Sequence, residues 1–103
     1  MALRHKFSEV VTVSSTAIGI TATELVDSNG LTQDIIMARF QLLSGGKIHE
    51  NAVNTPVAAA GDDWGRIKGT EWEVWGGSDL TNYLMVKQTG EADAKVVIHG
   101  YGN

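Results

Sequence analysis

The chain has 103 residues, of which 43% are hydrophobic and 19% charged, and its formal net charge is −4. This length suits one domain with a single small core, and the composition is that of a globular chain. The negative charge argues against partners that require a basic face, which are nucleic-acid phosphates and anionic membrane surfaces. The chain contains no cysteine, which excludes disulfides, thiolate metal sites and a cysteine nucleophile.

No segment has the character of a targeting or membrane sequence. Residues 1–6 are basic, but no apolar region follows them as it would in a signal peptide. No apolar run approaches the ~18 residues of a membrane helix. We therefore expect a protein that is made and used in the cytosol or released by lysis, with residues 1–6 as a polar N-terminal arm and residues 7–103 as one β-domain.

The first half of the chain has the pattern of short strands separated by turns. Residues 7–13 are rich in β-branched side chains and predict a strand. Residues 17–26 predict a short strand or extended segment, with a single helical or 3₁₀ turn at 23–25 as the alternative. After a turn signal at 27–30, residues 34–43 alternate in polarity as a strand does. Residues 47–50 can run back antiparallel to them through a glycine turn.

The C-terminal third holds the clearest strand pattern. Alternating β-formers at 70–75, 83–88 and 94–101 are separated by glycine-rich turns. Because the connecting turns are short, we expect these three strands to pair with one another and to form the framework of the domain. Residues 51–68 are the least regular stretch and predict a long crossover between two sheets.

Together these segments predict an all-β protein. Twelve glycines are spread along the chain against a single proline, which indicates many tight turns and therefore short strands. We expect seven or eight short strands, no clear helix and one longer loop. These elements make a compact antiparallel β-sandwich or jelly-roll-like single domain.

The sequence predicts neither a metal site nor a bound cofactor. The histidines are His5, His49 and His99, and none lies within four residues of another, whereas zinc ligands usually come in close pairs. We therefore expect histidines at the surface or at an interface. Residues 27–34 have too few oxygen ligands for a calcium loop, so an Asx turn is the better interpretation.

No catalytic motif is present either. The chain has no nucleophile elbow, no phosphate-cradling glycine loop and no dinucleotide fingerprint. Two carboxylate pairs, Asp62 with Asp63 and Glu71 with Glu73, are of the kind that supports acid–base chemistry. Solvated carboxylates in a loop and on a strand face are the commoner case, so we predict that the protein is not an enzyme.

The tryptophans offer a different kind of site. Alternation places Trp72 toward the core and Trp75 on the opposite face, with Glu71 and Glu73. Three interpretations are open for Trp64 and Trp75. They cap the edges of the core, they anchor a protein interface, or they stack on sugar rings.

The final strand is apolar on both of its faces. Val96 and Ile98 form one face, whereas Val97, His99 and Tyr101 belong to the other. Such two-sided strands indicate burial against a second molecule, and another copy of the chain is the first expectation. The predicted interface residues are Arg4, His5, Lys6, Trp64, Trp75, Val97, His99 and Tyr101.

Four segments carry a resemblance to a known group of proteins. They are an opening strand with small residues at 11–22, a central strand at 38–41, a glycine-turn segment with a strand at 75–87, and a final strand at 94–102. In this layout the chain resembles the small β-rich capsid decoration or cement proteins, which are head accessory proteins of tailed bacteriophages. The resemblance covers most of the chain, rests on layout and residue type, and does not extend to 61–65.

The resemblance implies a virion structural protein on the capsid surface. Such a protein binds the major capsid protein and other copies of itself, as a homotrimer over a local three-fold position, and needs no cofactor. The basic residues Arg4, His5 and Lys6 would suit an acidic partner surface. Two alternatives stay open, which are a carbohydrate-binding β-sandwich module and a head–tail connector or tail component.

Overall fold

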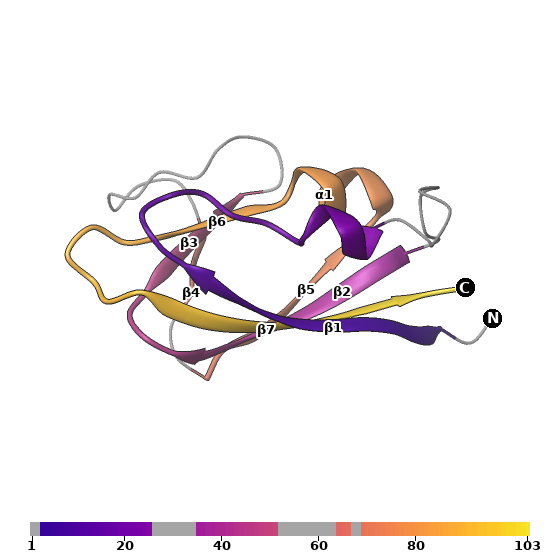
Figure 1. Ribbon diagram of the computed structural model, residues 1–103, viewed down its shortest axis with the longest axis horizontal. Helices are drawn as coiled ribbons and strands as arrows, with labels where there is room; N and C mark the ends of the chain where they lie inside the picture. The colour runs from indigo at the N-terminus through magenta and orange to yellow at the C-terminus, as the bar shows by residue number, and fades with distance from the viewer. Residues whose placement is uncertain (1–2, 26–34, 52–63, 67–68) are drawn as a thin grey trace.

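The computed structural model describes residues 3–25, 35–51, 64–66 and 69–103, and these form two antiparallel β-sheets (Figure 1). The elements are β1 (Arg4–Val13), the 3₁₀ helix η1 (Ala22–Leu25), β2 (Ile35–Ser44), β3 (Ile48–Asn51), β4 (Trp64–Arg66), β5 (Glu71–Trp75), α1 (Gly77–Asn82), β6 (Leu84–Lys87) and β7 (Ala94–Gly102). The predicted all-β class is confirmed. In the described ranges six strands have at least four residues and β4 has three, against the seven or eight strands expected.

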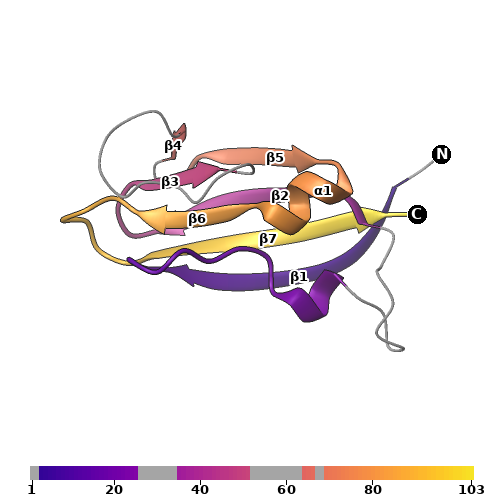
Figure 2. The same cartoon turned by 90° about the horizontal axis from the view of Figure 1, so that it is seen from above.

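The two sheets form layers that face each other. Strands β1, β7, β2 and β5, in this spatial order, make the four-stranded sheet, and β4, β3 and β6 make the three-stranded sheet. Seen from above, β6 and α1 lie over the four-stranded sheet (Figure 2). Strand β7 is central because it pairs antiparallel with β1 on one side and with β2 on the other. The two ends of the chain lie at the same end of the molecule (Figure 1).

The core lies between the two layers. Every second residue of β5 and β7 is buried, which gives Trp72 and Val74 in β5 and Ala94, Val96 and Ile98 in β7. This is the period of two that the sequence predicts for both strands. In β5 and β7 the core therefore forms from one face of the strand, whereas consecutive residues are buried in the shorter strands β3 and β6.

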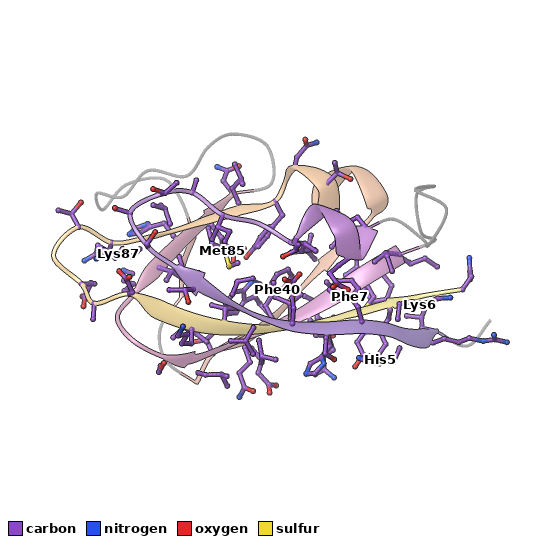
Figure 3. The ribbon with its side chains drawn as sticks, viewed as in Figure 1. His5, Lys6, Phe7, Phe40, Met85 and Lys87 are labelled. Carbon is purple, nitrogen blue, oxygen red and sulfur yellow. The ribbon has the colours of Figure 1, made fainter. Side chains whose placement is uncertain are left out.

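Aromatic rings occupy the centre of this core. The ring of Phe40 stacks on Trp72 with 5.6 Å between centroids and 7° between planes, and its centroid lies 4.7 Å from that of Tyr83. Figure 3 shows Phe7, Phe40 and Met85 between the two layers. Stacked and tilted ring pairs of this kind contribute about 0.5–1.5 kcal/mol each beyond the burial of their area.

A short chain of hydrogen bonds crosses the same region. The indole Nε1 of Trp72 donates to the Tyr83 hydroxyl at 2.7 Å, and this hydroxyl donates to Oε2 of Glu50 at 2.9 Å. Glu50 is only 8% exposed. The network links β5, β3 and the residue that precedes β6, so it ties the two sheets together by polar contacts as well as by packing.

One prediction about strand pairing is wrong. The strands expected at 70–75, 83–88 and 94–101 exist, but no two of them pair with each other. Strand β5 pairs with β2, β6 with β3, and β7 with both β1 and β2. Helix α1 separates β5 from β6, and the turn after β6 crosses from one layer to the other. A short connection thus permits a change of sheet as well as a hairpin, and the change lets both apolar faces meet in one core.

The same correction applies to the expected hairpin between β2 and β3. Strand β2 belongs to the four-stranded sheet and β3 to the three-stranded sheet. Their connection lies against the connection between β6 and β7. The Gly46 N–H donates to the Ala92 carbonyl at 3.3 Å, and the Gln88 N–H donates to the Lys47 carbonyl at 2.9 Å. The two crossings therefore stabilise each other.

The N-terminal region also differs from expectation. Arg4 to Lys6 begin β1 and are not part of an arm, because β7 extends to Gly102 and offers backbone partners as far as Arg4. The segment predicted at 17–26 contributes a single bridge between Ile18 and Met85, followed by η1, the 3₁₀ alternative. Within the described residues this segment follows the edge of β6 and is not a full strand.

Two further differences from the predictions lie in the second half of the chain. Helix α1 forms where a turn is expected, and it buries Leu80. Strand β4 lies within the stretch expected to be an irregular crossover, and it pairs with β3. The turn predicted at 27–30 and the carboxylates of Asp62 and Asp63 lie outside the described residues.

Candidate interaction surface

The outer face of the four-stranded sheet is the side turned away from the three-stranded sheet, and it is built from alternate residues of the four strands. The strand register aligns these residues in three rows across the sheet. The rows, each in the order β1, β7, β2, β5, are His5–Tyr101–Met37–Trp75, Ser8–His99–Arg39–Glu73 and Val10–Val97–Gln41–Glu71. Figure 3 shows His5 on this side of β1 and the buried Phe7 on the other.

Apolar side chains on this face are left uncovered by the rest of the chain. Trp75 is 53% exposed and Val10 is 58% exposed, at opposite corners of the three rows. Leu3 is exposed beside the first row, and Leu43 is exposed next to the inward-pointing Leu42. In the described ranges, every exposed large hydrophobic residue therefore belongs to this face. Exposed apolar side chains that occur on one face only, here at two of its corners, are typical of a contact surface.

Two shallow hollows lie on the outer face and share Arg39 and Tyr101. The larger has a volume of about 330 Å³, and its lining residues are Leu3, Met37, Arg39, Glu73, Trp75 and Tyr101. The smaller has a volume of about 140 Å³, and its lining residues are Arg39, Phe40, Gln41, Glu71, Val97, His99 and Tyr101. The larger hollow falls at the lower end of the range of small-ligand sites, about 300–1,000 Å³.

Met37 forms the floor of the larger hollow. Its alternation places it on the outer side with Arg39, yet it is only 3% exposed. The register sets it between Tyr101 on β7 and Trp75 on β5, and all three residues line the same hollow. This pairing makes the first row an apolar and aromatic strip.

Arg39 is held by two carboxylates of β5. Its Nε lies 3.4 Å from Oε2 of Glu73, and its Nη2 lies 3.9 Å from Oε2 of Glu71. The indole Nε1 of Trp75 donates to Oε1 of Glu73 at 3.2 Å. All four side chains are well exposed, so each ion pair is worth at most about 1 kcal/mol. These contacts orient the guanidinium and the indole more than they stabilise the fold.

Two imidazoles converge on one hydroxyl at the β1 side of the face. His5 Nε2 lies 2.7 Å from Ser8 Oγ, and His99 Nδ1 lies 2.6 Å from the same oxygen. The ring of Tyr101 meets the ring of His5 edge-on, with 5.6 Å between centroids. A hydroxyl carries one proton, so Ser8 donates to one imidazole and accepts from the other.

The structure brings together five of the eight predicted interface residues. His5, Trp75, Val97, His99 and Tyr101 all lie on the outer face. They lie together because β7 pairs with β1 and β2, and β2 pairs with β5. The predicted alternation of β5 and β7 was sufficient to place Trp75 on one side of β5, and Val97, His99 and Tyr101 on one side of β7.

The other three predicted residues are placed differently. Arg4 is exposed at the first position of β1, and Lys6 is half-buried at the point where the β1–β7 register shifts. Trp64 belongs to β4 in the three-stranded sheet, opposite Glu50, whereas Trp75 belongs to the four-stranded sheet. The two tryptophans therefore do not form a joint platform on one sheet.

Sequence reasoning missed several residues of the outer face. Leu3 falls within the predicted polar arm, and Ser8 falls within the strand predicted at 7–13, where the local pattern gives it no role in a site. The one signal that would have found Ser8 is its place three positions after His5, on a strand that pairs with the strand of His99. That signal requires knowledge of the pairing, which the local pattern does not contain.

Other polar groups are enclosed and offer no open site. His49 is 2% exposed, its Nε2 lies 3.1 Å from Oε1 of Gln88, and its Nδ1 has no hydrogen-bond partner among the described residues. Across the described ranges, no group of three or more histidine, aspartate or glutamate side chains is arranged to hold a metal ion. Nor does any helix in that part of the chain have the length and apolar character to cross a bilayer. Comparison of the chain with protein-family models, with curated proteins and with solved structures finds no match.

Proposed function

We propose that this chain is a non-enzymatic virion structural protein, a decoration protein that binds an outer capsid shell and further copies of itself through the outer face of the four-stranded sheet. The observation that carries the proposal is the gathering of Leu3, Val10, Leu43 and Trp75 on that one face. Uncovered apolar patches on small proteins mark contact sites, and tryptophan is among the residues that contribute most to binding at interfaces.

The polar residues of the face favour one orientation of a bound partner. Arg39, Glu71 and Glu73 are exposed, and their mutual ion pairs are weak enough to exchange for carboxylates or cations of a partner. Charged groups around an apolar patch favour the correct register and suppress wrong partners. A protein that coats a lattice needs only modest affinity per contact, because many copies act together.

The resemblance in layout to phage decoration proteins supports the identity of the partner. It favours the major capsid protein as the surface that is bound and a homotrimer as the assembled form. Arg4 is exposed at the start of β1, next to His5 of the outer face, and its positive charge suits an acidic capsid surface.

Sedimentation velocity tests this proposal, with purified protein alone and with empty capsids of the phage that encodes it. The variant Val10→Glu puts a charge into the apolar patch, and Thr89→Glu makes a matched change at an exposed position outside the outer face. We expect the wild type and Thr89→Glu to associate with capsids or with themselves, and Val10→Glu to lose this association. A wild type that stays monomeric and never sediments with capsids would overturn the proposal.

Carbohydrate binding is a second candidate, which the larger hollow favours. Trp75 offers a ring for the apolar side of a sugar, and Arg39 and Glu73 line the same hollow as a donor and an acceptor for hydroxyl groups. A glycan array would show binding by the wild type and by Val10→Ala, and none by Trp75→Ala. An array without any signal removes this candidate.

A head–tail connector or tail position is the remaining alternative within the virion. Such a site would use the same outer face against a different neighbour, so solution binding to capsids separates the two. A protein that binds itself but no capsid favours the connector or tail position.

A further inference from the structure

The pairing of β1 with β7 joins two histidines from opposite ends of the chain. His5 lies opposite Tyr101, and Ser8 lies opposite His99, all on the outer face. The sequence analysis predicts no metal site because the histidines are far apart along the chain. In the folded protein the His5 and His99 rings are 5.7 Å apart, centroid to centroid.

The two rings present nitrogen atoms to a common point. His5 Nε2 and His99 Nδ1 lie 2.7 Å and 2.6 Å from Ser8 Oγ, so they are at most about 5.3 Å apart. Two nitrogen ligands of one tetrahedral zinc ion, each at 2.0–2.1 Å, are about 3.4 Å apart. Rotation of the exposed Ser8 hydroxyl and a small approach of the exposed His5 ring would bring the nitrogens to this separation.

We propose that His5 and His99 bind one divalent transition-metal ion per chain, such as Zn²⁺ or Ni²⁺, at the position that the Ser8 hydroxyl now shares between them. Neutral imidazole is a preferred ligand of these ions. The bound form requires the His5 proton on Nδ1 and the His99 proton on Nε2, so that both converging nitrogens offer a lone pair. Water completes the coordination.

Both the ligand count and the local charge set the strength of this site. Two imidazoles are fewer than the four protein ligands of a closed zinc site, so the ion is exchangeable. Arg39 lies opposite His99 on β2, and its positive charge opposes a cation. Glu71 and Glu73 lie beside Arg39 and offset that charge. The site is therefore open and of moderate affinity, and it does not depend on the proposed capsid-binding function.

The chain provides its own control. Its only other histidine is His49, which is 2% exposed, and it contains no cysteine. Removing an outer-shell partner of a metal-binding histidine already lowers affinity by about 10- to 100-fold, so loss of either imidazole should lower it by at least about 100-fold. Ser8→Ala leaves both imidazoles in place and should retain binding.

The test is titration of the untagged full chain with Zn²⁺, followed by calorimetry and by NMR of the imidazole nitrogens. We expect one ion per chain, shifts at His5 and His99 but not at His49, and loss of binding in His5→Gln and in His99→Gln. The NMR spectrum of each variant reports whether it remains folded. Unchanged affinity in His99→Gln, shifts confined to His49, or no shift with excess Zn²⁺ would overturn the proposal.

Discussion

The two faces of the four-stranded sheet share one backbone but differ in what covers them. On the inner face Phe40, Trp72 and Ile98 are nearly or fully buried by the opposite layer. On the outer face Val10 and Trp75 are more than half exposed, although they belong to the same strands or their neighbours. The inner apolar residues are thus buried entirely by other parts of the same chain. The outer apolar residues have no such cover in the described part of the chain, which is why we assign them to contacts with other molecules.

The largest expected effect on stability comes from a substitution on the inner face. Phe40→Ala removes a ring that is 1% exposed and that packs on Trp72 and Tyr83. The free energy of unfolding should fall by about 3–5 kcal/mol, which is at least about a fifth of the 5–15 kcal/mol typical of a domain. Urea unfolding followed by tryptophan fluorescence measures it. A loss below about 1 kcal/mol would show that the core is not packed as described.

An intermediate effect tests the crossing that creates the two layers. Gly45 has φ of 94°, and a Cβ there would overlap the Asp93 carbonyl and lie 2.5 Å from the Ala94 Cα. Gly90 has a similar φ of 89° with nothing near the position of a Cβ. Both Gly→Ala changes should cost about 1–2 kcal/mol for the backbone conformation. Gly45→Ala should cost about 1–3 kcal/mol more for the overlap.

Thermal unfolding of Gly45→Ala and Gly90→Ala in the same buffer measures the difference between their midpoints. A clearly lower midpoint for Gly45→Ala than for Gly90→Ala supports the close approach of the β2–β3 connection to the start of β7. Equal midpoints would contradict that approach.

The smallest effect on stability is expected on the outer face. Trp75→Ala removes a half-exposed ring whose indole bonds only to the exposed Glu73 among the contacts seen here. The unfolding free energy should fall by about 1–2 kcal/mol, because only about half of the ring is buried. Urea unfolding again measures it. A loss comparable to that of Phe40→Ala would mean that the outer face belongs to the core.

Local patterns in the sequence were sufficient to predict which residues lie on each face of a strand. The alternation of Trp72 and Val74 with Glu71, Glu73 and Trp75 is observed as predicted, because the period of two is a property of each strand alone. The same holds for Val96 and Ile98 in β7. The all-β class follows from such segments without knowledge of their partners.

Strand partners could not be predicted in this way. Short turns around Gly45 and Gly90 suggested hairpins, but both connections change sheets, and that choice depends on which apolar faces meet across the whole fold. The contact of His5 with His99 has the same origin, since it exists only because β1 pairs with β7. Five residues of the candidate site were therefore predicted one by one, but their assembly on one face was not.

The most direct test of the central claim is an electron-microscopy map of the native assembly at a resolution that shows side chains. Our account predicts that the outer face of the four-stranded sheet, with Val10 and Trp75, lies against a neighbouring copy or the capsid shell. A map in which that face points to solvent, and the molecule is held by the three-stranded sheet instead, would contradict it.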